Sequence, residues 1–134
     1  MTAKQYMNRV RWIDKEIQAL DRLIIKTRES VESITQKYDS DGAQATKNPH
    51  KFDRLVELEA LVNDKVQEQL NLKADTLLTI SKIKDRRQRI ILTEYYLKMK
   101  TFEEISVELH YSWKQIHRLH GYALKSVDAI INGK

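Results

Sequence analysis

The sequence predicts an all-α protein in which a long antiparallel helical hairpin precedes a small helix-turn-helix domain. The 134 residues include only 3 Gly and 1 Pro, and 32% of them are charged, a composition typical of nearly all-helical proteins. Apolar residues in the first third of the chain alternate four and three positions apart, which is a heptad pattern. Two helix-start signals lie eleven residues apart near the end of the chain.

Residues 3–38 are predicted to form one long helix. Its apolar seam continues over more than four heptads, so we expect a coiled coil. Such a seam either packs on the chain's own next helix, which is the interpretation we favour, or serves as a partner-binding face. The seam consists of Tyr6, Val10, Ile13, Ile17, Leu20, Ile24, Thr27, Val31, Ile34 and Tyr38.

Residues 39–50, with the sequence DSDGAQATKNPH, are predicted to form a loop. They contain the only Pro and several Asp, Ser and Asn residues, which favour turns. Asp39 and Asp41 are spaced like the first ligands of a calcium loop. The downstream ligands and terminal Glu of an EF-hand are missing, so we expect no metal site.

Residues 51–83 are predicted to form the second long helix, antiparallel to the first. Its apolar stripe is broader and less strictly heptad, which suits a helix that touches two neighbours. We therefore expect a coiled-coil hairpin over residues 1–83 and a homo-oligomer formed through it. The junction at 81–84 has no Gly or Pro, which leaves open a straight continuation or a bend. The stripe consists of Phe52, Leu55, Leu58, Leu61, Val62, Val66, Leu70, Leu72, Leu77, Leu78, Ile80 and Ile83.

Residues 84–99 are predicted to form a lead-in helix that begins the second domain, residues 84–134. Asp85 can cap its start, because an N-cap carboxylate accepts from free backbone N–H groups. Three arginines follow this cap, and they are either phosphate contacts or a solvated cluster. They are Arg86, Arg87 and Arg89.

Two capping boxes predict two further helices. Thr101 followed by Glu104 places the first helix at Phe102 to about Leu109, and Ser112 followed by Gln115 starts the second at Trp113. Only two residues separate Leu109 from the Ser112 cap. The helices must therefore cross sharply, as in a helix-turn-helix.

The apolar faces of these two helices leave a polar set at the start of the second. Phe102, Ile105 and Leu109 form one face, and Ile116, Leu119, Ala123, Leu124 and Val127 form the other. A recognition helix reads bases with its N-terminal residues. We expect Trp113, Lys114, Gln115, His117 and Arg118 to read base edges, although Trp113 alternatively covers the rim of the core. The expected phosphate contacts are Arg86, Arg87, Lys100, Thr101, Ser112 and Lys125.

The charge distribution favours a nucleic-acid partner. Residues 1–81 contain 13 Lys/Arg and 13 Asp/Glu, whereas residues 82–134 contain 11 Lys/Arg and 6 Asp/Glu. The whole net charge of +5 therefore lies in residues 82–134, the segment that contains the second domain. A basic domain beside a neutral one is typical of nucleic-acid binders, although a basic solvated face without a polyanion remains the alternative.

Residues 101–127, TFEEISVELHYSWKQIHRLHGYALKSV, resemble the region-4 helix-turn-helix of bacterial sigma factors, which has the form TLEEIAExLGVSxxxVxxIxxxALxxL. The chain as a whole, from MTAKQYMNRVRWID to YSWKQIHRLH, resembles the RinA- and ArpU-like regulators of late phage genes. This resemblance implies a three-helix, sigma-region-4-like domain that regulates transcription by binding DNA. The positions that match the sigma pattern are Thr101, Glu103, Glu104, Ile105, Leu109, Ser112, Ile116, Leu119, Ala123, Leu124 and Val127.

The chain departs from that pattern at three positions. His110 stands where the family has a turn glycine, and a left-handed backbone there is tolerated by His at some cost. Trp113 and His117 replace the Arg-rich outward set. The promoter element that sigma factors read is therefore not carried over to this chain.

The motifs weigh against catalysis and cofactors. There is no Cys, no phosphate-binding Gly loop, no HExxH and no nucleophile elbow. His117 and His120 have a zinc-compatible spacing but lack a third ligand. With no signal peptide or membrane span, we expect a cytoplasmic protein of a bacterial host that binds double-stranded DNA as a phage or prophage transcriptional regulator. A small-terminase-like packaging factor and an RNA-polymerase adaptor without DNA affinity are the alternatives.

Overall fold

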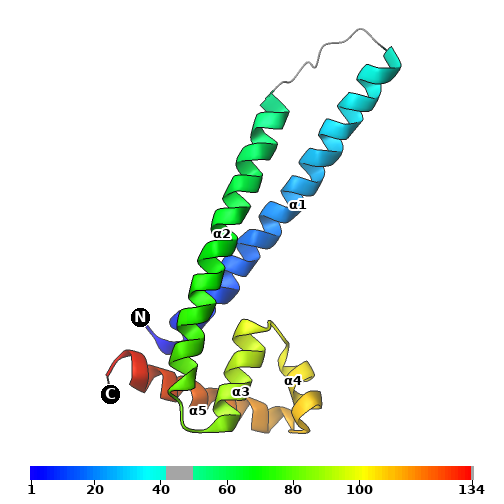
Figure 1. Cartoon of the computed structure of the whole chain (residues 1–134). Coiled ribbons are helices and arrows are strands. Elements are labelled where there is room, and N and C mark those ends of the chain that lie inside the picture. The colour runs from blue at the N-terminus through cyan, green and yellow to red at the C-terminus, as the bar shows by residue number, and fades with distance from the viewer. Residues whose placement is uncertain (42–49, 134) are drawn as a thin grey trace. The chain divides into compact units, whose positions relative to one another are not determined.

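A computed structural model describes residues 1–41 and 50–133, and all regular structure in this part is helical, as predicted (Figure 1). The predicted loop is shorter at both ends, because the flanking helices continue to Asp41 and begin at His50; helix boundaries commonly shift by one or two residues. The rest of that loop, and the side chains of Asp39 and Asp41, lie outside the described residues. The helices are α1 Ala3–Asp41, α2 His50–Ser81, α3 Arg86–Leu92, the π-helical turn η1 Thr93–Leu97, α4 Phe102–Leu109 and α5 Trp113–Ile131.

The chain forms two compact units whose limits differ from the sequence boundary between residues 83 and 84. One unit joins Met1–Ile13 to Gln69–Lys134, and the other is Asp14–Glu68. The first unit is larger than the three C-terminal helices because residues from the start of α1 and the end of α2 also belong to its apolar core. Ala3 and Met7 of α1 belong to the same cluster as the buried residues of α3, α4 and α5. That core consists of Ala3, Met7, Ile80, Ile83, Ile91, Leu92, Tyr96, Ile105, Ile116, Leu119, Ala123 and Val127.

In the unit Asp14–Glu68, α1 and α2 run antiparallel. Arg28 pairs with Glu59 and Glu16 pairs with Lys65, each at 2.7 Å, so the later residue of α1 meets the earlier residue of α2. The seam members in this unit are buried or half-buried as far as Val31, which is the face that the heptad pattern selects. Ile34 and Tyr38, the last two predicted members, lie outside the described side chains.

The segment between α2 and α3 bends, which settles the question that the sequence left open. Helix α2 ends at Ser81, and the Asp85 carboxylate caps α3 by accepting from the backbone N–H of Arg87 at 2.8 Å. Arg89 donates to the carbonyls of Ile83 and Lys84, at 2.6 and 2.9 Å. Those carbonyls lie past the end of α2 and outside its helical hydrogen bonds. Arg89 is thus a structural donor at the bend.

The lead-in helix is not uniform over residues 84–99, contrary to prediction. Its last turn is π-helical, with Lys98 N–H donating to the Thr93 carbonyl at 3.0 Å. The Thr93 hydroxyl donates back to the Arg89 carbonyl at 2.8 Å, a bond that competes with the regular helix ladder. Met99 then adopts a left-handed φ of 61°. The wider turn places Tyr96 in the core, 1% exposed, while Tyr95 stacks on Phe102 with ring centroids 4.2 Å apart.

Candidate nucleic-acid interface

Helices α4 and α5 begin where the two capping boxes predict. The Thr101 hydroxyl accepts from the Glu104 backbone N–H at 3.2 Å, and the Ser112 hydroxyl accepts from that of Gln115 at 3.2 Å. The side chains of Glu104 and Gln115 complete the boxes by accepting from the cap N–H groups. Both starts are therefore set by hydrogen bonds that span three residues.

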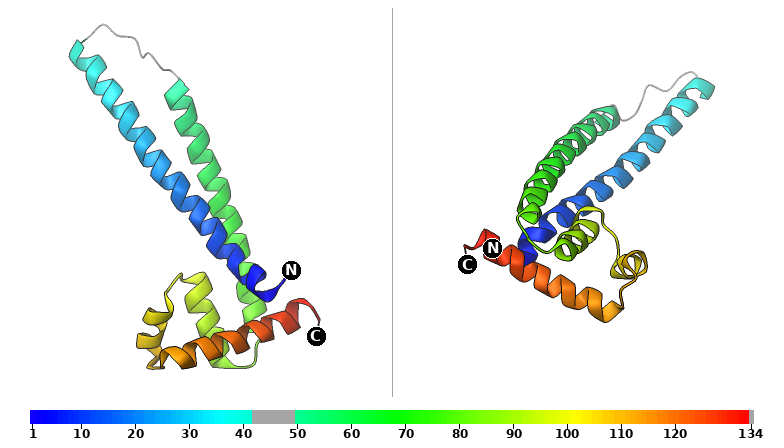
Figure 2. Two further views of the ribbon diagram at one scale, coloured as in Figure 1. Left: turned by 180° about the vertical axis from the view of Figure 1, so that it is seen from behind. Right: turned by 60° about the horizontal axis from the view of Figure 1, so that its bottom comes forward.

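The turn between α4 and α5 is short and closed. His110 has a left-handed φ of 58°, at the position where the sigma pattern has Gly. Tyr111 N–H donates to the Ser106 carbonyl at 3.1 Å, and the Ser106 hydroxyl donates to the Tyr111 carbonyl at 2.5 Å. Figure 2 shows the resulting sharp change of direction between the two helices.

Helix α5 presents its cations on the side opposite its apolar face. Ile116, Leu119, Ala123 and Val127 are buried, and four exposed residues recur on the other side at spacings of four, three and four. This outer stripe consists of Lys114, Arg118, Gly121 and Lys125. It contains no carboxylate and spans about 16 Å at 1.5 Å per residue.

The cations of the outer stripe have no carboxylate partner within residues 1–41 and 50–133 as far as their side chains are described. Among the described residues, neither Lys114 nor Arg118 has an ion-pair or hydrogen-bond partner. Lys125 lies 5.8 Å from the centroid of the exposed Tyr122 ring. Charges left free on one helix face are available to a polyanion.

Gly121 is the unusual member of the outer stripe. A glycine inside an exposed helix costs about 1 kcal/mol relative to Ala. A Cβ built on Gly121 would meet nothing within 4 Å. No contact within the described protein therefore explains why this position lacks a side chain.

A hollow of about 220 Å³ lies beside the outer stripe and is lined by Arg87, Tyr111, Gln115, Arg118, Leu119 and Tyr122. Two of these side chains are guanidinium groups, contributed by α3 and α5. Asp85 lies 3.4 Å from Arg87 and raises the pKa of that guanidinium by hydrogen bonding. The Arg87 side chain is still 62% exposed. Both arginines can therefore reach an anion at this place.

The rings of Trp113 and His117 contact each other in a tilted arrangement at the start of α5. Their ring centroids are 3.8 Å apart, and the His117 ring also lies 4.6 Å from that of Phe102. Trp113 is 57% exposed, but His117 is half-buried and its Nε2 is enclosed without a partner in the described part of the chain. His117 was predicted to read bases, but its side chain is less exposed than a base contact requires.

His120 belongs to the aromatic rim of the core. Its Nε2 lies 2.7 Å from the Tyr96 hydroxyl, and burial lowers the pKa of His120 to about 4. The imidazole is consequently neutral near pH 7, where it can share one hydrogen bond with the buried tyrosine.

Lys100 differs from the other expected phosphate contacts. Its Nζ lies 2.6 Å from Glu94 and 2.8 Å from Glu108. These carboxylates, Glu108 first, raise the pKa of Lys100. Because two anions already hold this ammonium, it joins η1 to α4 and is not available to phosphate. Arg86, Thr101, Ser112 and Lys125 are exposed, although both hydroxyls also serve as caps.

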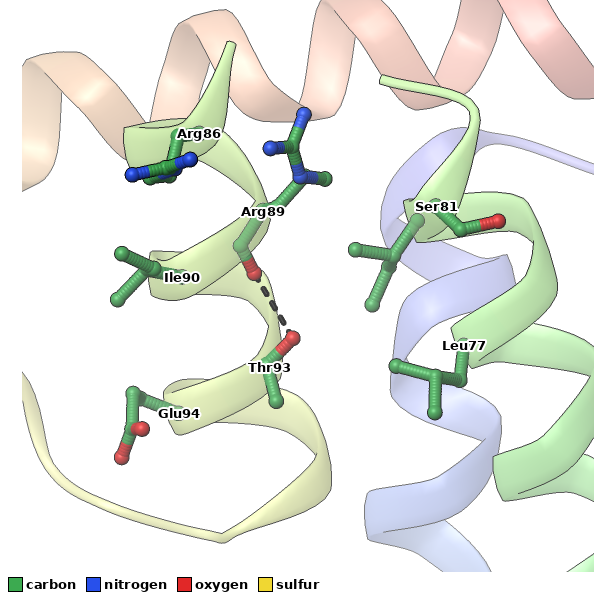
Figure 3. A pocket seen from close by; sticks show the side chains of 8 residues that line it. Leu77, Ser81, Arg86, Arg89, Ile90, Thr93 and Glu94 are labelled. Carbon is green, nitrogen blue, oxygen red and sulfur yellow. Dashed lines mark hydrogen bonds between the residues drawn. The ribbon is translucent and has the colours of Figure 1, made fainter. Parts of the chain in front are cut away.

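A larger hollow of about 610 Å³ lies between the end of α2 and α3 (Figure 3). Arg86 and Ile90 of α3 and Glu94 of η1 lie along one side, while Thr93 of η1 lies toward Leu77 of α2. Arg86 marks the rim nearest the start of α3. The remaining lining residues are Ile80, Ser81 and Arg89.

No helix in the described ranges is long and apolar enough to cross a bilayer. No protein-family model, curated protein or solved structure matches this chain. The resemblance to sigma region 4 and to the RinA- and ArpU-like regulators therefore stays a prediction.

Sequence reasoning missed three residues of this surface: Tyr111, Gly121 and Tyr122. The spacing of apolar residues in α5 could have predicted that Gly121 and Tyr122 face outward. Removing its buried positions leaves residues 121, 122 and 125 outward, one and two turns beyond Arg118. The inward placement of His117 carried no such signal, because it depends on Phe102 of another helix.

Proposed function

We propose that this protein binds double-stranded DNA sequence-specifically, without catalysis, as a phage or prophage transcriptional regulator. In this proposal α4 and α5 are the helix-turn-helix, α3 is the third helix of a sigma-region-4-like domain, and α5 enters the major groove. The observation that carries it is the set of exposed cations on α5, without a carboxylate partner in the described part of the chain, directly after a tight interhelical turn. An exposed helix face that carries cations fits the major groove of duplex DNA and its flanking phosphates.

The base-reading roles divide according to geometry. Arg118 and Lys114 are exposed and unpaired, so each can donate to guanine N7 and O6. Gln115 already uses its carbonyl oxygen in the capping box, which leaves its amide nitrogen as a donor to an acceptor on a base. Trp113 lies beside them and offers an apolar face to a thymine methyl group.

The phosphate contacts are the exposed groups around this centre. They are Arg86, Arg87, Lys125 and the cap hydroxyls of Thr101 and Ser112. Lys100 is not included because its ammonium group forms ion pairs with Glu94 and Glu108. Phosphate contacts orient the protein on the duplex and carry no sequence information directly.

The paired α1 and α2 helices form a coiled-coil hairpin that brings copies of the chain together. Large apolar side chains stay exposed on both helices, and apolar surface of this kind marks interaction sites. An oligomer would bring two recognition helices to two half-sites. The exposed residues are Trp12, Leu23, Ile25, Phe52, Val56, Leu61, Leu70, Leu77 and Leu78.

A salt series of binding to labelled duplexes tests the proposal. The protein is titrated by fluorescence anisotropy into fragments of the neighbouring genome, with random duplex as competitor. A specific regulator gives a steep dependence of log K on log salt and keeps a preference for some fragments. Analytical ultracentrifugation of the same samples measures the stoichiometry on and off DNA.

The two alternatives predict other outcomes. A small-terminase-like packaging factor gives a steep salt dependence, no fragment preference and a ring-shaped oligomer. An adaptor binds RNA polymerase and shows no duplex binding even at low salt. Either outcome would contradict the proposed function.

A further inference from the structure

Gly121 lies in the interior of a 19-residue helix, exposed, with open space around the position of its absent Cβ. Glycine is disfavoured there, and its backbone is helical, so a special backbone conformation does not explain it. Contacts within the described protein do not explain it either. A helix face without a side chain at this position leaves room for another molecule to approach the helix backbone closely.

The neighbours of Gly121 indicate the chemistry of that molecule. Arg118 and Lys125 flank it at three residues before and four residues after, and Lys114 lies two turns before it on the same stripe. No carboxylate shares this stripe. Three cations around a bare patch of helix complement a polyanion rather than another apolar helix.

We infer that α5 leaves the bases after Arg118 and approaches the sugar-phosphate backbone of duplex DNA at Gly121, the point of closest approach, with Lys125 beyond it. The inference rests on the proposed function and extends it, because base contacts come from the first turns of a recognition helix. Gly121 lies in the third turn, where the helix leaves the bases. Arg118 still reaches a base edge before this point, Lys125 contacts a phosphate beyond it, and the absent side chain lets the helix backbone reach the strand.

Substitutions that add bulk at Gly121 separate this contact from stability. Gly121→Ala raises the melting temperature by roughly 3 °C, since alanine is the better helix former. It lowers duplex affinity about tenfold on preferred and random DNA alike, because the backbone contact does not depend on sequence. Gly121→Lys also lowers affinity, although it adds a cation to the stripe.

Asn71→Ala is the matched control, because it also improves an exposed helical position but lies on α2, away from the stripe. It raises the melting temperature and leaves DNA affinity unchanged. Circular dichroism establishes that each variant keeps its helicity.

The outcomes distinguish the inference from the function on which it rests. If the wild type binds duplexes and Gly121→Ala binds equally well, or Gly121→Lys binds more tightly, the close approach is overturned while the proposed function stands. If the wild type binds no duplex at low salt, both fail. Loss of affinity in both Gly121 variants, with an unchanged Asn71→Ala, supports the inference.

Discussion

The two faces of helix α5 have opposite chemistry and different surroundings. On the inner face, Ile116, Ala123 and Val127 are 0% exposed and belong to the core of the first unit. On the outer face, Lys114 and Arg118 are exposed and have no partner among the described residues. If the outer face binds DNA as proposed, substitutions on the two faces should change different measurements, namely stability on the inner face and duplex affinity on the outer face.

The largest expected effect is on the inner face. Ile116→Ala removes a fully buried side chain and should lower the free energy of unfolding by about 2–5 kcal/mol through lost burial and a cavity. Urea denaturation followed by circular dichroism measures it. Val107→Ala is the control, because Val107 is 74% exposed and its loss should change stability by less than about 0.5 kcal/mol. Equal effects would contradict the placement of the core.

The second expected effect is a pH dependence of stability that comes from His120. Burial lowers the pKa of His120 from 6.5 to about 4, so below pH 6.5 the unfolded chain binds a proton that the folded chain does not. Stability is therefore full above pH 6.5 and falls toward pH 4, by about 1.4 kcal/mol per unit and about 3 kcal/mol in all. Lys4, His117, Tyr95 and Tyr96 surround the group.

Thermal unfolding between pH 4 and 8 measures this contribution. The variant His120→Gln has no proton to gain there, so its melting temperature should vary less with pH than that of the wild type. Parallel curves for the two proteins would exclude His120 as the source.

The third effect belongs to the outer face. Arg118→Ala should weaken binding to a preferred duplex by about 1–3 kcal/mol and relax its sequence preference, while the melting temperature stays the same. Arg86→Ala should weaken preferred and random duplexes alike, because a phosphate contact carries no sequence information. Anisotropy titrations with both duplexes measure the difference. A uniform loss for Arg118→Ala would remove its assigned role as a base reader.

The smallest effect concerns a cation that the sequence grouped with the DNA contacts. Lys100→Met breaks the ion pairs with Glu94 and Glu108 and should lower the melting temperature slightly. Duplex affinity and its salt dependence should not change, because this ammonium is already neutralised. A shallower salt dependence in the variant would show that Lys100 contacts phosphate after all.

Local hydrogen bonds explain why the starts of α4 and α5 were predictable. Thr101 with Glu104, and Ser112 with Gln115, each form their box within three residues, so the signal is contained in the local sequence. The capping box of Thr2 and Gln5 before α1 has the same form, with bonds of 2.9 and 3.1 Å. Alternation of apolar residues likewise predicted which side of α1 is buried as far as Val31.

The sequence by itself determined the helical composition, both starts of the α4–α5 pair and the cations at the start of α5, because each depends on neighbours within one or two helical turns. The left-handed turn at His110 was expected from the resemblance to the sigma pattern, which has Gly at that position. Tertiary structure alone decided that Glu94 and Glu108 bind Lys100, and that Phe102 of α4 lies against His117 of α5. It also decided that Ala3 and Met7 complete the core of the C-terminal helices. These features depend on side chains brought together from different helices, and a pattern along the chain contains no distance between them.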